Sequence, residues 1–191
     1  MKYLVVYAHP NPKSFCHAIK EEIVVRLKEQ GAIVDVRDLY QMGFNPVLSA
    51  NDFMQLAQKK IPADIQKEQD LVAGADTIIF IYPVWWFSMP AILKGYVDRV
   101  FMRGFAYDMK GHMLQGLLKG KKAMLFSTTG GPRFAYYLLG YLVAMKIAID
   151  AGVFNFCGLK VALHKYFYAV PTISDGARRQ MLASIKNIKF S

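Results

Sequence analysis

The sequence predicts an α/β protein whose five parallel strands form one doubly wound sheet with helices on both faces. Short apolar runs rich in β-branched and aromatic residues alternate along the chain with segments of helical periodicity. Glycine and proline separate these segments. At 191 residues the chain fits one domain, residues 1–191, because one core can bury most of its apolar surface.

The first strand, helix and second strand are expected close together in the chain. Residues 3–8 form a short apolar run, which is typical of a buried parallel strand. Two prolines then require a loop, after which Ser14 can cap a helix. Gly31 ends that helix, and residues 33–39 alternate as a second strand. The buried face of the helix recurs at a four-residue spacing, through Ile19, Ile23 and Leu27.

The middle of the chain repeats this alternation. Pro62 suits the start of a helix that runs to about residue 75, and residues 77–82 are strongly strand-like. Residues 90–101 are expected to form the next helix, and residues 122–127 the fourth strand. Irregular segments of about twenty residues are often functional in a compact domain, and the chain has two of them, at 40–61 and 102–121.

A long helix is expected from Phe134 to about Ala151, followed by a strand at 156–163 and a last helix, capped by Ser174, to about residue 188. From Phe134 to Met145 the long helix has no charge and is apolar all the way round. A helix that is apolar on every face is normally buried on every face. In a small α/β domain the outer face would meet water, so we expect a second copy of the chain to cover it.

That helix is not expected to cross a membrane, because Lys146 and Asp150 interrupt it before about twenty apolar residues have passed. With 54% hydrophobic and 20% charged residues, the composition is that of a globular protein. Nothing at the amino terminus predicts a signal peptide. Cys16 and Cys157 provide neither a disulfide framework nor zinc spacing, so a reducing, cytoplasmic location is expected.

The net charge of +10 lies in one half of the chain. Residues 101–191 carry 13 basic and 3 acidic side chains, which accounts for the whole excess (13 − 3 = 10). A basic half of this kind can be a solvated surface, or it can attract an acidic protein partner or a phosphorylated cofactor. No basic run is interleaved with aromatic residues, so nucleic acid is not expected as a partner.

Three loops that follow strands carry unusual residues, and ligands of an open α/β sheet bind at the carboxyl ends of its strands. The loop at 9–16 leads into a helix amino terminus, where free amides suit a phosphate group. The side chains of His9, Lys13 and Ser14 add donors there. The same residues can instead serve only for packing and capping.

The loop at 83–90 places three aromatic residues in a row between two prolines, and they cannot all face one core. The loop at 128–136 contains Gly130 and Gly131, which allow the backbone to approach a planar ligand. Alone, the aromatic run is equally compatible with a packed loop, and a pair of glycines is more often a simple turn than a ligand site. Their convergence at one sheet edge predicts a site for a flat molecule such as a flavin or a quinone.

Several other classes lack their motifs. The sequence has no glycine-rich Rossmann fingerprint and no Walker loop, so nicotinamide would visit an existing site. No cluster of His, Cys and Asp has metal-ligand spacing, and no metal is expected. A Gly-x-Ser-x-Gly elbow is absent, so a hydrolase would lack its nucleophile.

The chain resembles the NAD(P)H:quinone oxidoreductases of the DT-diaphorase type, in the flavodoxin-like superfamily. The resemblance covers nearly the whole chain. It is carried by several specific stretches: His9 with Ser14-Phe15, Asp38-Leu39-Tyr40, Phe44-Asn45-Pro46, Pro83-Val84-Trp85-Trp86-Phe87, Pro90-Ala91-Ile92-Leu93-Lys94-Gly95, Arg99-Val100-Phe101, Gly104-Phe105-Ala106-Tyr107, residues 128–131 and Phe156-Cys157-Gly158.

This resemblance implies a flavin at the strand ends and a ping-pong reaction, in which NAD(P)H gives hydride to the flavin and a flat quinone-like acceptor then takes it. The residues implied for the phosphate and ribityl part are His9, Lys13, Ser14, Phe15 and Cys16. Those implied for the isoalloxazine are Pro83, Val84, Trp86, Phe87, Thr128, Thr129, Gly130 and Gly131. Tyr136 matches the catalytic tyrosine, and the substrate wall is implied to be Trp86 with Tyr107 and Phe156, the latter two from the neighbouring subunit of a homodimer.

Two positions depart from the family pattern. Lys13 replaces a small hydroxyl residue of the animal enzymes and should strengthen phosphate binding. The second catalytic residue of the family, a histidine six positions after the tyrosine, falls on Leu142, which cannot relay a proton. We therefore expect Tyr136, alone or with Arg133 or water, to stabilise the charge that develops on the reduced flavin. The reaction should be slowed but not abolished.

Alternatives to a quinone reductase remain. Some members of the family activate a potassium efflux system as regulatory subunits, and the basic half of this chain could face such an acidic partner. A flavodoxin-like electron carrier is a further alternative, although Tyr136 and the apolar helix disfavour it. Arg178, near the adenine side of the family's site, favours FAD over FMN.

Overall fold

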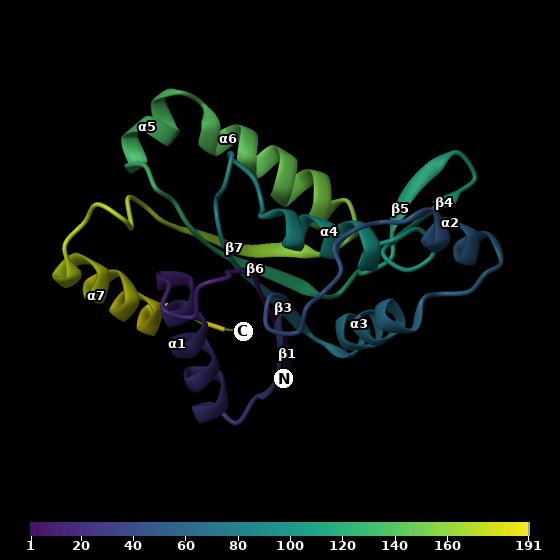
Figure 1. The fold of residues 1–191 in the computed structure, drawn as a ribbon, viewed down its shortest axis with the longest axis horizontal. Helices are drawn as coiled ribbons and strands as arrows, with labels where there is room; N and C mark the ends of the chain where they lie inside the picture. Colours follow the sequence, from purple (N-terminus) through teal and green to yellow (C-terminus); the bar gives the residue numbers. More distant parts are fainter. Residues whose placement is uncertain (191) are drawn as a thin grey trace.

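The computed structural model describes residues 1–190, and its central feature is a five-stranded parallel sheet with the strand order β2-β1-β3-β6-β7 (Figure 1). This order is that of the flavodoxin-like doubly wound fold, so the predicted fold class is confirmed. The strands of the sheet are β1 (Lys2–Tyr7), β2 (Ile33–Asp38), β3 (Thr77–Pro83), β6 (Lys122–Thr128) and β7 (Lys160–Phe167). A separate antiparallel hairpin consists of β4 (Tyr107–Lys110) and β5 (Met113–Gly116).

Helices cover both faces of the sheet. The α-helices are α1 (Phe15–Glu29), α2 (Ala50–Ala57), α3 (Ala63–Gly74), α4 (Ala91–Val100), α5 (Arg133–Leu138), α6 (Tyr141–Met145) and α7 (Asp175–Ala183). The π-helix η1 (Lys146–Asn155) and the 3₁₀-helix η2 (Ser184–Asn187) complete the set. In Figure 1, α1 and α7 lie together on one side of the sheet, while α5, α6 and η1 follow the other side. None of the helices in residues 1–190 is long and apolar enough to cross a membrane.

Two apolar cores result from the alternation of side chains along the strands. On β1, Leu4 and Val6 pack into the core beneath α3 and α4, whereas Tyr3 and Val5 pack into the core beneath α1 and α7. Each central strand is therefore buried on both faces, as parallel strands require. The predicted caps Ser14 and Ser174 are confirmed, because each hydroxyl accepts a hydrogen bond from an amide of the first helical turn.

The predicted long helix from Phe134 to Ala151 is wrong as a single element. Gly140 adopts a left-handed conformation (φ +71°), which separates α5 from α6, and the chain then continues as η1 to Asn155. The expected burial of every face is also not met within one chain. Six apolar side chains of this segment are each between 60% and 75% exposed: Phe134, Tyr137, Leu138, Leu139, Val143 and Ile147.

The strand expected at 156–163 begins four residues later, as β7. Phe156 and Cys157 are apolar but belong to the turn after η1, and the chain leaves this turn through Gly158 with φ +89°. Apolar character alone therefore placed the start of the strand too early. The correction matters for the site, because it moves the carboxyl end of β7 to Phe167.

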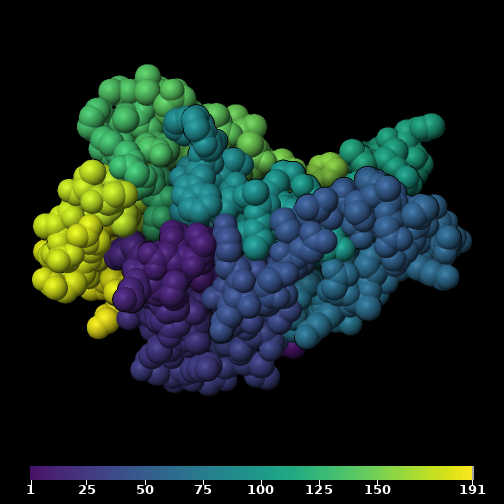
Figure 2. Space-filling view, in the orientation of Figure 1, coloured from purple at the N-terminus to yellow at the C-terminus, as the bar shows by residue number. Residues whose placement is uncertain are grey.

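Both segments expected to be irregular contain regular structure. Segment 40–61 contains α2, which begins with a capping box between Ser49 and Asp52. Asp52 also receives two hydrogen bonds from the buried guanidinium of Arg99, at 3.1 and 3.2 Å, which ties α2 to α4. Segment 102–121 contains the β4–β5 hairpin, which projects beyond the body of the molecule (Figure 2).

Candidate functional site

The amino terminus of α1 forms one end of the candidate site. The hydroxyl of Ser14 accepts a hydrogen bond from the amide of His17 at 3.1 Å and lies 3.3 Å from the phenol oxygen of Tyr7. The first amides of an α-helix have no partner within the helix. This end of α1 can therefore donate hydrogen bonds to a phosphate group, and the exposed Lys13 adjoins it in sequence.

His9 lies at the same end of the sheet as a neutral side chain. Its Nδ1 accepts a hydrogen bond from the amide of Asn11 at 3.0 Å, so the ring proton resides on Nε2. Burial lowers the pKa of His9, which favours the uncharged ring near neutral pH. His9 can thus donate one hydrogen bond through Nε2 without bringing a fixed charge.

A cavity of about 270 Å³, here named the strand-end cavity, opens where the three strand-end loops meet. The Sγ atom of Cys16 lies 3.2 Å from Oγ1 of Thr128, which joins the first loop to the third. Burial raises the pKa of Cys16 to about 12, so its thiol stays protonated. The lining consists of His9, Ser14, Phe15, Cys16, Pro83, Val84, Trp85, Thr128, Thr129, Gly130, Val170 and Pro171.

Gly130 leaves a space in this cavity that a side chain would fill. A Cβ atom at Gly130 would meet no other atom within 4 Å, whereas one at Gly131 would lie 3.1 Å from the ring of Tyr136. A backbone hydrogen bond ties this loop to the end of β7, since the amide of Thr129 donates to the carbonyl of Phe167 at 2.8 Å. The backbone at Gly130 can therefore approach a planar group closely.

The aromatic loop is a tight turn in a strained conformation. Trp85 and Ser88 exchange two backbone hydrogen bonds, and the two residues between them, Trp86 and Phe87, have φ values of +50° and +58°. Positive φ is uncommon for bulky residues and costs roughly 1–2 kcal/mol per residue. The turn leaves the side chain of Trp86 96% exposed. Such strain is often found where a surface is built for a ligand.

Replacing Trp86 by glycine should stabilise the protein without ligand by about 1 kcal/mol, because glycine adopts positive φ without strain and Trp86 buries almost nothing. Thermal unfolding of the cofactor-free protein measures this change. Lys59→Gly is the matched control, since Lys59 has φ +58° outside the site. An unchanged or lower melting temperature for Trp86→Gly, with a higher one for Lys59→Gly, would contradict the strain at Trp86.

Tyr136 is buried one turn into α5, beside the strand-end cavity. Its ring lies 5.8 Å from the ring of Phe87 and 5.9 Å from that of Tyr168, measured between centroids. It also contacts the position of Gly131. The structure thus brings the predicted Tyr136, Phe87 and Gly131 together at the edge of the cavity, although none of the three lines it.

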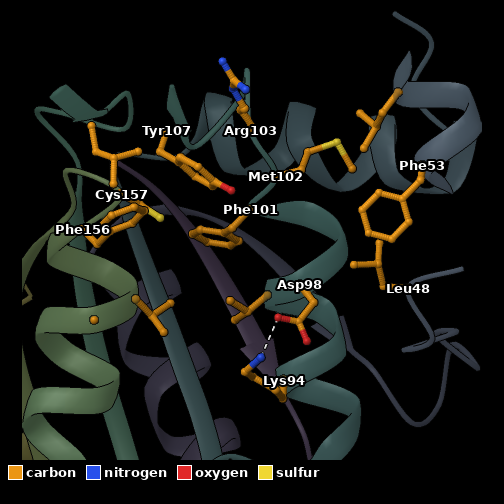
Figure 3. A pocket seen from close by; sticks show the side chains of 15 residues that line it. Leu48, Phe53, Lys94, Asp98, Phe101, Met102, Arg103, Tyr107, Phe156 and Cys157 are labelled. Carbon is orange, nitrogen blue, oxygen red and sulfur yellow. Dashed lines mark hydrogen bonds and ion pairs between the residues drawn. The ribbon is translucent and has the colours of Figure 1, made fainter. Parts of the chain in front are cut away.

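Tyr107 and Phe156 lie elsewhere, in a second cavity of about 610 Å³ that we name the hairpin cavity. Their rings are 5.2 Å apart between centroids. Figure 3 shows them on one side of the hairpin cavity, with Phe53 and Leu48 on the opposite side. The two cavities share no lining residue, so one chain does not bring Tyr107 and Phe156 to the strand-end cavity.

Sequence reasoning missed Val170 and Pro171 as lining residues of the strand-end cavity. They follow β7, and the strand assigned too early placed its carboxyl end at 163 instead of Phe167. A proline shortly after an apolar run was the available signal. Within residues 1–190 no three side chains of His, Cys, Asp or Glu gather where they could hold a metal ion.

Comparison with known proteins finds relatives that align with nearly the whole of this chain. The family model described as "Flavodoxin-like fold" matches residues 1–188. An NAD(P)H oxidoreductase of Haemophilus influenzae is 40% identical over 95% of this chain and 91% of its own length. The ribosyldihydronicotinamide dehydrogenase [quinone] of Mus musculus is 39% identical over 96% of this chain and 88% of its own.

A solved structure agrees with these relatives. The NAD(P)H:quinone oxidoreductase from Methanothermobacter marburgensis superposes with a TM-score of 0.88 at 26% sequence identity. The superposition covers 98% of this chain and 96% of the other. Similarity therefore extends over the whole sheet and both layers of helices.

Proposed function

The chain belongs to the flavodoxin-like family of NAD(P)H:quinone oxidoreductases and is an oxidoreductase of that family. From this premise we propose that the strand-end cavity holds a flavin through which NAD(P)H reduces flat, two-electron acceptors such as quinones. The observation that carries the proposal is the cavity itself, whose lining includes both a helix amino terminus and the open backbone of Gly130.

The residues present fit a flavin. The α1 amides with Ser14 and Lys13 would bind the phosphate, and His9 would donate from Nε2. Pro83, Val84 and the backbone of Gly130 would enclose the flat ring, with Thr128 and Thr129 at its edge. Trp86 and Phe87 would present their rings toward the acceptor. When bound, a flavin supplies two-electron chemistry between NAD(P)H and the acceptor, and the protein supplies position and charge.

FAD is the form of the cofactor that we propose. Arg178 lies in the first turns of α7 and donates to the carbonyl of Val170, a lining residue of the strand-end cavity, at 2.8 Å. Asp175 holds the same guanidinium at 2.7 Å. A guanidinium held beside the cavity supports FAD, because it would be available to the additional phosphate or the adenine that FMN lacks.

The apolar face of α5, α6 and η1 supports a homodimer. Large apolar side chains gathered on one exposed segment of a small domain usually mark an interface, and here they are Phe134, Tyr137, Leu138, Leu139, Val143 and Ile147. The hairpin cavity would then face the partner's strand-end cavity, so that Tyr107 and Phe156 complete a shared site. A single chain keeps these two groups of residues apart, which is the reason that we propose the partner as the source of the wall.

Absorption spectroscopy tests the flavin directly. The purified protein, incubated with FAD or FMN and dialysed, should be yellow, lose its colour with NADPH and regain it with menadione. A colourless protein that binds neither flavin would refute the proposal. A yellow protein that neither NADH nor NADPH bleaches would indicate an electron carrier instead.

Tyr136→Phe should lower turnover roughly 100-fold and leave flavin affinity nearly unchanged, because it removes one hydroxyl that meets developing charge and keeps the packing ring. Steady-state kinetics with menadione and a fluorescence titration of the flavin measure the two effects. Tyr3→Phe is the matched control, since Tyr3 lies near the amino end of β1, where its hydroxyl donates to the carbonyl of Phe190 and not to the strand-end cavity. Equal turnover in Tyr136→Phe and wild type would remove Tyr136 from the reaction.

A further inference from the structure

A row of polar side chains lies directly beneath the strand-end cavity. Tyr82, Ser127 and Tyr166 are register partners on β3, β6 and β7. Each of them directly precedes a residue that forms or supports the cavity: Pro83, Thr128 and Phe167. Tyr82 and Ser127 are 0% exposed, although polar groups rarely occupy the centre of a parallel sheet without a specific role.

His164 connects this row to a buried carboxylate. Its Nε2 lies 3.0 Å from Oγ of Ser127, and its Nδ1 lies 2.6 Å from Oδ1 of Asp150. The imidazole is 0% exposed, whereas Asp150 reaches the surface beside Lys146, whose Nζ is 3.6 Å away. The order Ser–His–Asp is that of a hydrolase triad, but a substrate cannot reach the fully buried hydroxyl of Ser127.

The network can hold its imidazole in two protonation states. Burial lowers the pKa of His164 even though Asp150 acts in the opposite direction, so the ring is neutral near pH 7. In that state Nδ1–H donates to Asp150, and the hydroxyl of Ser127 donates to Nε2. A second proton on Nε2 would reverse the Ser127 bond and turn its hydrogen away. The phenol oxygen of Tyr82 can receive that hydrogen, since it is buried without any hydrogen-bond partner in residues 1–190.

A column of rings leads from His164 toward the reaction site along one face of β7. The ring of His164 stacks on that of Tyr166 at 4.0 Å, and Tyr166 stacks on Tyr168 at 6.0 Å. Tyr168 in turn contacts Tyr136 at 5.9 Å. Leu142, where the resemblance expects a second proton-relaying residue, packs in the same cluster as Tyr136. A charge on His164 therefore acts across packed aromatic rings, where electrostatic effects are stronger than in water.

We propose that Asp150, His164 and Ser127 form a buried proton store that balances the charge of the bound flavin, with His164 as a positioning residue that does not touch it. This inference rests on the proposed function. A bound flavin reduced by NAD(P)H would receive two electrons and one proton, which would leave one negative charge for the protein to balance. His164 would hold one further proton, which exchanges with water through the partly exposed carboxylate of Asp150, and would release it by the same route when the acceptor leaves with two electrons and two protons. The titratable groups that face His164 are Asp150 and Lys146 of η1 and the phenols of Tyr82 and Tyr166.

Nitrogen NMR of the flavin-loaded wild-type protein tests the store without any mutation. With ¹⁵N-labelled histidine at pH 7, the two ring nitrogens of His164 should differ in the oxidised protein and become equivalent, both protonated, after reduction by dithionite. His112, in the exposed turn of the hairpin, should not change. A His164 ring that stays neutral in the reduced protein would overturn the proposal.

The reduction potential of the flavin gives a second test. Each proton taken up with two electrons makes reduction tenfold less favourable per pH unit, which corresponds to about 30 mV. Between pH 6 and 8 the slope for wild type should exceed that of His164→Gln by this amount, and His112→Gln should match wild type. Equal slopes in all three proteins would overturn the proposal.

Two further outcomes of these experiments can be told apart. Should His164→Gln fail to fold, Asp150→Asn removes the charge that holds the ring and should also reduce the slope. A wild-type protein that binds no flavin would refute the proposed function, before any statement about His164 is tested. A protein that binds flavin and is reduced by NADPH, yet shows a neutral His164, would refute only the proton store.

Discussion

Gly130→Leu is expected to abolish flavin binding while the protein remains folded. The leucine side chain would occupy open space beside Gly130, which lines the strand-end cavity and meets nothing within 4 Å of its Cβ position, so it would take room that we propose for the flat ring. Because nothing in the protein alone opposes this side chain, it should cost little stability. A loss of only about 3 kcal/mol of binding free energy raises the dissociation constant more than 100-fold, and direct overlap with the ligand should exceed that.

Absorbance after reconstitution and dialysis measures the flavin retained, and thermal unfolding of the cofactor-free proteins measures stability. Gly74→Leu is the matched control. Gly74 ends α3 just before β3, at the amino ends of the strands and away from the cavity, and its Cβ would make only an ordinary contact of 3.5 Å with Lys2. The control should bind flavin like wild type. If Gly130→Leu retains its flavin at full occupancy, the ligand lies elsewhere and the strand-end cavity is not its site.

The fold could be predicted because apolar periodicity and caps act locally. The pattern of Ile19, Ile23 and Leu27 and the caps at Ser14 and Ser174 are decided within a few residues, and the structure places each of them as expected. The doubly wound class also follows from the alternation of strands and helices, whereas the strand order was not predicted from the residues. Elements decided by distant contacts were missed. The helix α2 depends partly on Arg99, which lies 47 residues beyond Asp52 in the chain.

The end of the long apolar segment shows a second reason why the bounds of some elements could not be predicted. A left-handed Gly140 and a turn that exits through Gly158 shift the start of β7, and neither changes the count of apolar residues. Periodicity distinguishes helix from strand but does not detect where one residue reverses the backbone. The lining residues Val170 and Pro171 were missed as a consequence.

Some features of the candidate site could be predicted from the sequence and others could not, for the same reasons. The glycines, the capping serine and the aromatic run each lie in the loop that follows a parallel strand, so their convergence at the strand ends could be expected from topology. The positive φ values of Trp86 and Phe87 could not, because bulky residues rarely adopt them. Ser127, Asp150 and His164 are separated by more than ten residues each, and only the pairing of β6 with β7 and the packing of η1 bring them together.

Two inactive variants are expected to restore activity when they form mixed dimers. Gly130→Leu removes the strand-end cavity of its own chain, and the double variant Tyr107→Ala with Phe156→Ala removes the aromatic wall of the hairpin cavity. In a two-fold dimer with a shared site, a mixed dimer has one intact cavity facing one intact wall. Coexpressed at equal levels, the two chains should recover about one quarter of the wild-type activity, because half of the dimers are mixed and each has one working site.

Affinity tags of two kinds isolate the mixed dimer, and its turnover with NADPH and menadione is compared with both parent dimers. If the wall belonged to the same chain as the cavity, both sites of the mixed dimer would carry a defect, and it would be as inactive as its parents. Adding Leu138→Asp to both chains provides the control. Leu138 is 75% exposed on the apolar face, and a charge there would face the partner, so the dimer should separate and the recovered activity should be lost. A mixed protein that stays dimeric and active despite Leu138→Asp would show that the apolar face is not the interface.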